Sequence, residues 1–474
     1  MRPVPLNKVL QYRRGRHRRL TIPQFTVVTG LLVILLGTLL LSTPLCSNAS
    51  VGLWEAFFTA TSAITVTGLT IIDIGTDLTG FGQIVLAAMI LAGGLGLMAI
   101  TTFLQGFVVQ GTALRQRIDR GRTLDEFGVG GVGSTFRGIA LTAALVILIG
   151  AAILYSYGFD DIADPAERLW AALFHSISAY NNAGFGLWSD SLERYRSNGV
   201  VNGVVMLLIV MGGLGWRVTS DLTGRLMRRG RGRGRLSLHT RLVLRTTFLL
   251  IGIGTVGLAL TEWLNKGENF LTLSWSERWM TALFQSVTAR TAGFNTVPFS
   301  IDSITESGIL LMVSLMFIGA SPGGTGGGIK TTTVAALMAA TRCTLRSRDA
   351  VVIRNREISD KVVLRAVGIT VASLLFVLVM TLLISFASNF NGRDEFTFLA
   401  MLFTCISAFA TVGLDVGVTA QLGHFSQSVL LVGMFVGRLG ILLLLSAIWE
   451  AFTREQIHIH RQNRIGYPRE DLYV

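Results

Sequence analysis

Apolar segments long enough to cross a lipid bilayer constrain the fold of this chain more than any other feature of its sequence. A transmembrane helix needs about 20 consecutive, mostly apolar residues. Eight such runs occur, at approximately 24–45, 80–106, 136–157, 199–222, 241–263, 306–340, 362–387 and 424–450. Only 15% of the residues are charged, against roughly 25% in soluble domains. The sequence therefore predicts an all-α, multi-pass membrane protein.

The basic residues predict the orientation of these spans. Of the 41 Lys and Arg residues, 32 lie in the connections on one side, at 1–23, 107–137, 217–245, 341–365 and from 451 onward. Cytoplasmic loops are enriched in Lys and Arg. We therefore expect a bacterial plasma (inner) membrane protein with both termini in the cytoplasm. The net charge of +13 follows from this topology, so no nucleic-acid partner is expected.

A shorter, half-apolar segment lies within each successive pair of spans. These segments begin near Trp54, Glu167, Trp275 and Asp394, and each continues for about three helical turns, which suits a re-entrant pore helix but not a span. The predicted fold is four tandem helix–pore-loop–helix repeats, with eight spans and four re-entrant pore helices, in a pseudo-four-fold arrangement. The predicted divisions are a cytoplasmic basic N-terminus at 1–23, repeats at 24–110, 111–222, 223–340 and 341–450, and a cytoplasmic tail at 451–474.

A glycine follows each short segment in a recurring pattern. In three copies a Phe lies ten residues before the glycine and an Ala five before it, and the third copy in the chain is one residue shorter. The glycines are Gly68, Gly184, Gly293 and Gly413, separated by 116, 109 and 120 residues. A recurring period of this kind indicates repeated structural units.

These glycine loops predict a cation pore. Backbone carbonyls that replace the hydration shell of an ion line cation filters, and glycine reaches the required backbone angles most easily. Non-helical backbone at membrane depth is tolerated only where it lines a water-filled cavity or is buried in protein. The alternative is that the glycines mark close helix contacts. That interpretation suits most of the 53 glycines, such as Gly93, Gly94 and Gly96, but not four loops in register.

The four loops resemble the filter loops of the Trk/Ktr/HKT superfamily of K⁺ transporters. The matching segments are Val66-Thr67-Gly68-Leu69-Thr70, Asn181-Asn182-Ala183-Gly184-Phe185, Arg290-Thr291-Ala292-Gly293-Phe294-Asn295 and Ala410-Thr411-Val412-Gly413-Leu414. The resemblance covers about residues 20–450. It is greater for the Ktr membrane subunit than for the Trk one, because the chain begins with the first repeat and has no extra N-terminal hairpin.

The resemblance implies channel-like K⁺ uptake through one site for a dehydrated ion. The site would be lined by carbonyls of Val66, Thr67, Gly68, Asn182, Ala183, Gly184, Thr291, Ala292, Gly293, Thr411, Val412 and Gly413. All four loops keep glycine, which in this superfamily accompanies a preference for K⁺.

The sixth span contains a break. Residues 319–328 include six glycines and one proline, and in a helix each interior Gly costs about 1 kcal/mol and Pro about 3 kcal/mol relative to Ala. The resemblance implies an intramembrane gate beneath the filter, formed by Gly323, Gly324, Thr325, Gly326, Gly327, Gly328, Lys330 and Arg438. The alternative, a phosphate-binding loop, requires Gly directly before Lys and a preceding strand. Ile329 stands before Lys330, and no strand is predicted.

Two arginines lie at membrane depth. Arg438 is in the middle of the eighth span, where a charge normally faces the protein interior or water. It either bonds a carbonyl structurally or, as the resemblance implies, lies on the pore axis near the gate as an electrostatic barrier. Arg290 precedes the third loop and is expected to be structural or to tune the outer mouth.

The expected partners and ions follow from the same interpretation. The membrane potential draws cations inward at about 2.3 kcal/mol per charge per 100 mV, so a gated pore needs no ATP. No cofactor is expected in this chain; K⁺ is the transported ion and Na⁺ a candidate activator. The resemblance implies a homodimer with a cytosolic ring of RCK-type regulatory subunits, which carry the nucleotide. The basic loops 217–245 and 341–365 would contact that ring, set the topology only, or bind anionic lipids.

Two other functions compete with a gated pore. An alternating-access carrier also uses broken helices near the midplane, and two inverted halves with paired broken helices would favour it. An intramembrane enzyme is not expected, because no span carries paired carboxylates, a His/Ser dyad or an H-E-x-x-H motif.

Overall fold

The computed structural model describes residues 22–48, 51–96, 129–227, 236–264, 273–300, 303–348, 350–353, 356–390, 396–441 and 444–445. The predicted cytoplasmic tail at 451–474, most of the N-terminal segment 1–23 and the boundary at 110/111 lie outside these residues. The regular secondary structure within them is helical apart from one antiparallel hairpin, β1 (Val352–Ile353) with β2 (Arg356–Glu357), and two isolated bridges.

The helices follow one another in a recurring order. The first half contains α2 (Ile22–Leu41), α3 (Leu53–Thr65), α4 (Ile74–Asp77), α5 (Gly80–Leu91), α7 (Val129–Ile153), α8 (Pro165–Asn181), α9 (Gly199–Leu214) and α10 (Trp216–Met227). The second half contains α11 (Leu238–Leu264), α13 (Trp275–Thr288), α14 (Glu306–Phe317), α15 (Thr331–Leu345), α16 (Asp360–Phe390), α17 (Phe398–Ala410) and α18 (His424–Leu439). π-Helical turns extend α5 to Gly96 and α7 to Gly158.

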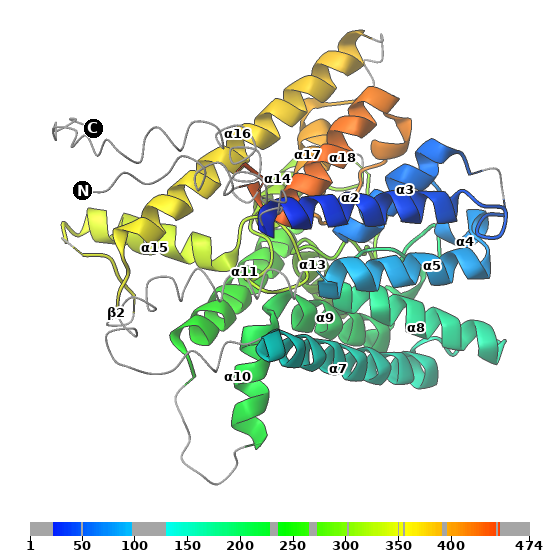
Figure 1. Ribbon diagram of the computed structural model, residues 1–474, viewed down its shortest axis with the longest axis horizontal. Coiled ribbons are helices and arrows are strands. Elements are labelled where there is room, and N and C mark those ends of the chain that lie inside the picture. The colour runs from blue at the N-terminus through cyan, green and yellow to red at the C-terminus, as the bar shows by residue number, and fades with distance from the viewer. Residues whose placement is uncertain are drawn as a thin grey trace, which may run out of the picture.

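Each of four short helices contacts the longer helix before it and one further helix. α3 lies against α2 and α5, α8 against α7 and α9, α13 against α11 and α9, and α17 against α16 and α18. Figure 1 shows the first two groups as blue and cyan-green layers on one side of the molecule. The four short segments expected from the sequence are therefore helices, each packed against the long helix that precedes it.

Local sequence signals set where three of the short helices begin. The Asp164 carboxylate accepts from the backbone N–H groups of Ala166 and Glu167 before α8. Ser274 and Glu277 form a capping box at the start of α13. The Thr397 hydroxyl accepts from Ala400 N at α17. Such caps satisfy N–H groups that have no partner within the helix, so the starts of these helices are encoded locally.

The outer faces of the long helices are apolar. On α2, Leu32 and Leu39 are about three-fifths exposed, and α16 exposes Leu382 and Phe386 in the same way. Contiguous exposed apolar faces of this kind mark contact with lipid or a partner. Three described helices are long and apolar enough to cross a membrane alone, at Phe136–Gly158, Leu238–Leu264 and Asp360–Ser388. The other described apolar helices are shorter, so the count of eight full-length spans remains a prediction.

One predicted span is not a single straight helix. The fourth, expected to run unbroken over 199–222, is bent by 103° between α9 and α10. Gly215 forms the bend with a φ of +84°, and a Cβ there would meet Pro322 O at 2.8 Å. Trp216 N donates to Gly323 O at 3.2 Å. The span ends because the break in the sixth span packs against it. The glycine-rich run Gly212-Gly213-Leu214-Gly215 is the sequence feature that could have predicted this bend.

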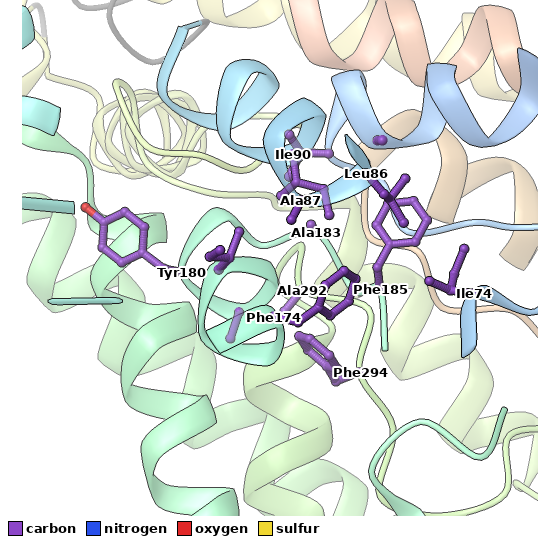
Figure 2. Packing of buried hydrophobic residues seen from close by; sticks show 14 of the residues in the cluster. Ile74, Leu86, Ala87, Ile90, Phe174, Tyr180, Ala183, Phe185, Ala292 and Phe294 are labelled. Atoms are coloured by element: carbon purple, nitrogen blue, oxygen red, sulfur yellow. The ribbon is translucent and has the colours of Figure 1, made fainter. Parts of the chain in front are cut away.

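The recurring Phe and Ala residues belong to the buried core, which consists of two large clusters. Phe58, Phe174, Phe284 and Phe403 are fully buried, as are the matching alanines Ala63, Ala179, Ala289 and Ala408. Burying a Phe side chain stabilises a fold by about 1.5–3 kcal/mol. Figure 2 shows this packing beside the second and third glycine loops, with residues Leu86, Ala87, Ile90, Phe174, Ala183, Phe185, Ala292 and Phe294. The core therefore holds the glycine loops in place.

Candidate cation site

Each short helix ends in a strained backbone conformation. The residue two positions before each repeated glycine has a positive φ without being glycine: Val66, Asn182, Thr291 and Thr411, at 55°, 59°, 80° and 51°. The glycines themselves have φ between +71° and +94°. Such a conformation is a genuine outlier for the β-branched residues Val66, Thr291 and Thr411 and costs about 1–3 kcal/mol, whereas Asn adopts it more readily. The same left-handed conformation at four equivalent positions, three of them strained, shows that the surrounding structure imposes this loop shape.

The four loops touch one another in a closed circuit. A Cβ built on Gly68 would lie 2.4 Å from Ala183 O, and one on Gly184 would lie 2.8 Å from Ala292 O. A Cβ on Gly293 would lie 2.4 Å from Val412 O, and one on Gly413 would lie 2.1 Å from Thr67 O. The first loop thus meets the second, the second the third, the third the fourth, and the fourth the first. Eight of the twelve predicted site residues make these contacts, namely each repeated glycine and the residue directly before it. The other four, Val66, Asn182, Thr291 and Thr411, precede them in the same loops.

The backbone carbonyl oxygens of the circuit are free to accept, whereas backbone N–H groups in three of the loops already donate hydrogen bonds. Thr67 N donates to Ser62 O at 2.9 Å, Ala183 N to Ser178 O at 2.8 Å, and Val412 N to Ser407 O at 2.8 Å. In the described part of the chain, none of the twelve carbonyl oxygens of the site residues accepts a hydrogen bond. Buried carbonyls without a partner are costly, so this lining suits a ligand that needs oxygen atoms, which is a cation.

Hydroxyl groups hold the loops in shape, which the sequence reasoning missed. Ser62 Oγ accepts from Gly68 N at 3.0 Å, and Ser407 Oγ accepts from Gly413 N at 3.1 Å. In the shorter third loop, Thr288 Oγ1 instead donates to Phe294 O at 2.7 Å. The signal in the sequence was a serine six residues before the first and fourth glycines.

Side chains below the glycines connect two of the loops. The Asn182 amide lies 3.0 Å from Thr291 Oγ1. When the amide is oriented to satisfy all its neighbours, its oxygen accepts from Thr291 and its nitrogen donates to Ala179 O and Ile209 O. The second and third loops are therefore joined by side chains as well as by backbone contact.

A cavity of about 490 Å³ opens above the glycines. Asp73, Glu193 and Asp415 are among its lining residues, which include no Lys or Arg. Asn295 Nδ2 donates to Glu193 Oε1 at 2.8 Å, which joins the segments that follow the second and third loops. Burial raises the pKa of the Glu193 carboxyl; Asp190 raises it further, and the bond from Asn295 opposes the shift. The cavity is an acidic vestibule over the circuit of carbonyls.

The break in the sixth span lies against the opposite side of the circuit. Thr325 Oγ1 donates to Tyr180 O at 3.4 Å, and Gly327 N donates to Thr411 Oγ1 at 2.9 Å. A Cβ on Gly326 would lie 2.0 Å from Thr291 Oγ1. The glycines here permit close contact with the third and fourth loops and with the end of α8 at once. Because α14 precedes this segment instead of a strand, the phosphate-loop alternative is not supported.

Lys330 lies beside this segment. Lys330 Nζ donates to Gly326 O at 2.6 Å and to Gly327 O at 3.3 Å. Arg438 is buried, and its Nη2 donates to Gly93 O at 2.9 Å. Lys330 therefore bonds the break in the sixth span itself, whereas Arg438 bonds the π-helical turn that extends α5.

Arg290 points away from the outer mouth. Its Nη1 donates to Thr247 O at 3.4 Å and its Nη2 to Gly319 O at 3.2 Å. The hypothesis that it tunes the outer mouth is wrong, because these bonds direct the guanidinium group toward the start of the break in the sixth span. The structural alternative is supported.

The helices have apolar outer faces and enclose strained loops that are rich in hydrogen-bond acceptors. This combination defines a multi-pass membrane protein with a candidate site formed by backbone carbonyls in its interior. The chain matches the TrkH family model, whose description is cation transport protein, over residues 7–451, and belongs to this family. The predicted resemblance is confirmed. The family and the relatives below are transport proteins, and the chain is not an enzyme.

Two relatives are named Ktr system potassium uptake protein B. The one from Bacillus subtilis is 33% identical over 461 residues, with 96% of this chain and 97% of the relative covered. The one from Vibrio alginolyticus is 35% identical over 428 residues, with 89% and 90% covered. The potassium/sodium uptake protein NtpJ of Enterococcus hirae is 30% identical over 459 residues, with 96% and 98% covered.

The fold is shared with a solved transporter. The crystal structure of the potassium transporter TrkH from Vibrio parahaemolyticus matches with a TM-score of 0.70 at 20% identity, covering 92% of this chain and 86% of that one. At this identity the match establishes the fold alone.

Proposed function

We propose that this protein is the ion-conducting membrane subunit of a K⁺ uptake system of the Trk/Ktr type. The observation that carries the proposal is the closed circuit of four loops whose buried carbonyls accept no hydrogen bond within the described residues. A dehydrated K⁺ ion needs oxygen ligands from several directions, and rings of backbone carbonyls supply them. The names of the B. subtilis and V. alginolyticus relatives support K⁺ as the ion.

The finer features of the proposal concern organisation and control. The four helix groups at 24–110, 111–222, 223–340 and 341–450 are proposed to be pseudo-four-fold repeats around one conduction axis, with both termini cytoplasmic. The segment 323–328 with Lys330 and Arg438 is proposed to be the gate. Its contacts with two of the four loops and with the last turn of α8 support a role directly below the ion site.

The proposed partners are a second copy of the chain and a cytosolic RCK-type ring that carries the nucleotide. Relatives named as parts of a Ktr system support an assembly of more than one component. Sodium is retained in the proposal as an activator. The name of the E. hirae potassium/sodium uptake protein supports an interaction of this family with Na⁺ as well as K⁺.

One observation favours the carrier alternative. Two spans are broken, at Gly215 and at 318–330, and paired broken helices are typical of alternating-access carriers. Here, however, the two breaks contact each other directly: Ser321 N donates to Gly213 O at 3.1 Å, and Thr325 N donates to Gly212 O at 3.2 Å. The proposed site receives carbonyls from four loops, which favours a pore.

Complementation tests the proposed function. A bacterial strain that lacks K⁺ uptake should grow at low external K⁺ when it expresses this chain, together with a Ktr-type regulatory subunit if the chain alone is inactive. The Gly68→Ser variant, whose side chain would meet Ala183 O, serves as the control and should not support growth. Absence of rescue, with the wild-type chain present in the membrane and with the regulator supplied, would contradict the proposal.

The vestibule predicts a dependence of uptake on external pH. Because the pKa of Glu193 is raised, its carboxylate takes up a proton at a higher pH than an ordinary Glu when the medium is acidified. The vestibule then loses negative charge, and the K⁺ concentration at half-maximal uptake should rise as pH falls through this pKa.

Rubidium uptake between pH 7 and pH 4.5 measures this effect. In Glu193→Gln the half-maximal concentration should be raised by about two- to fivefold at neutral pH, as expected for loss of one partly screened charge, and its pH dependence should be reduced. Glu306→Gln, an exposed change at the start of α14, is the matched control. Equal pH profiles for the wild type and Glu193→Gln would contradict a role for this carboxylate.

A further inference from the structure

A pocket with five arginines lies away from the cation site, between α11, α15 and the β1–β2 hairpin. Its volume is about 340 Å³. The helices α11 and α15 contact each other, and the hairpin lies beside α15 (Figure 1). The arginines come from two different basic connections of the sequence: Arg241 and Arg245 from the first, and Arg342, Arg346 and Arg348 from the second. The fold thus joins two basic segments at one place.

These arginines lack anionic partners in the described part of the chain. Among the lining residues of the pocket there is no Asp or Glu. No ion pair of these five guanidinium groups occurs with any described carboxylate. The Nε atom of Arg241 is buried and has no hydrogen-bond partner among the described residues. Five like charges repel one another at short range, so the site is suited to an anion that accepts several hydrogen bonds, and Arg is the residue best suited to phosphate.

The remainder of the pocket is apolar and continues along a face of α11. Leu249, Ile253 and Met338 line it and are each about half exposed. Beyond the pocket the same face of α11 exposes Val256 and Leu260. Half of the hydrocarbon thickness of a bilayer is about 15 Å, or about ten residues of helix. An acyl chain that starts beside Arg245 therefore has an apolar surface along its whole length.

We propose that this pocket binds an anionic phospholipid. The phosphate would be held by Arg241, Arg245, Arg342, Arg346 and Arg348, and an acyl chain would lie along Leu249 and Ile253. The arginines and the apolar wall together favour an anionic phospholipid. A free phosphate would not contact the apolar wall, and a zwitterionic lipid, which has no net charge, would gain less from five arginines. The arginine-rich connections are those expected in the cytoplasm, so the lipid would come from the inner leaflet, which is anionic.

The proposal is independent of the conducted ion. It requires only a membrane-embedded chain, so lipid binding and K⁺ uptake can fail separately.

Native mass spectrometry of the full chain in detergent tests the proposal. Dioleoyl-phosphatidylglycerol and dioleoyl-phosphatidylcholine are titrated separately, and glycerol 3-phosphate is added as a soluble competitor. We expect the first phosphatidylglycerol to bind about tenfold more tightly than phosphatidylcholine, since each basic residue near a membrane surface contributes appreciably to anionic lipid binding. Glycerol 3-phosphate should not displace it at equal concentration, because it lacks the acyl chain.

Matched variants locate the site. Arg342→Gln with Arg346→Gln should weaken the first phosphatidylglycerol about tenfold or more. Arg217→Gln with Arg365→Gln removes the same charge from exposed positions on α10 and α16 that do not line the pocket, and should leave binding unchanged. Ala339→Trp fills the pocket without changing charge, and should weaken the same binding event even where the double arginine variant does not remain monodisperse.

Three results would overturn the proposal. Equal weakening by the two double arginine variants would mean that only net charge matters. Displacement by glycerol 3-phosphate would identify a site for free phosphate esters. An altered oligomeric state of the Arg342→Gln/Arg346→Gln chain, with phosphatidylglycerol binding unchanged, would identify the pocket as a contact between copies.

Discussion

Gly413→Ala is expected to abolish K⁺ uptake at low external K⁺, whereas Gly417→Ala should retain it within a few-fold. Both glycines follow α17 and both have a left-handed backbone, with φ of +89° and +84°. An Ala at either position therefore bears a similar conformational penalty, of about 1–2 kcal/mol. The two differ in surroundings: a Cβ at Gly413 would lie 2.1 Å from Thr67 O, whereas one at Gly417 has no atom within 4 Å.

The clash at Gly413 acts on the site itself. Backbone atoms of the first loop must shift to admit the methyl group, and the shifted carbonyl is one of those proposed to coordinate K⁺. Ion coordination depends on the position and number of these oxygens, so the loss in uptake should be about a hundredfold or more. Comparing Gly413→Ala with Gly417→Ala therefore distinguishes damage to the contact between the fourth and first loops from the backbone strain that both variants bear.

Rubidium uptake and growth at low K⁺ measure this prediction, with the membrane content of each variant determined in parallel. If Gly413→Ala and Gly417→Ala transport equally well, the contact between the fourth and first loops has no part in conduction, and the proposed site is wrong.

Arg438→Ala is expected to raise the K⁺ leak about tenfold or more, and Arg438→Lys to leave it near the wild-type value. Arg438 is buried, and the barrier hypothesis places its guanidinium group on the path of the ion. At an effective dielectric constant of about 20, a unit charge about 5.5 Å from a passing K⁺ raises its energy by about 3 kcal/mol. Removal of one such charge lowers the barrier, whereas Lys preserves it.

A purely structural role for Arg438 gives a different pattern. The bond from Arg438 Nη2 to Gly93 O joins α18 to the turn after α5, so its loss alone would lower the unfolding temperature without a leak. Potassium efflux from proteoliposomes, measured beside thermal unfolding for both variants, distinguishes the two. A lower unfolding temperature for Arg438→Ala with an unchanged leak would contradict the barrier hypothesis.

The sequence alone determined where the short helices and the glycine loops after them would lie, for reasons that are local. The starts of three short helices are encoded by Asp164, Ser274 and Thr397, whose side chains accept hydrogen bonds from backbone N–H groups two or three residues later. The glycines that end each segment have backbone angles that other residues adopt rarely, so their positions are visible as a recurring pattern. Such preferences depend only on residues nearby in the chain, so they can be predicted from the sequence without the tertiary structure.

Only the tertiary structure decided how distant segments meet. The contact of Gly413 with Thr67 O joins residues from opposite ends of the chain, and the direction of Arg290 depends on Gly319 and Thr247. The bend at Gly215 arises because Pro322 and Gly323 occupy the space beside it. Contacts of this kind form only when whole helices pack closely against one another. No local backbone preference specifies which helices meet, so these contacts are not visible in the sequence.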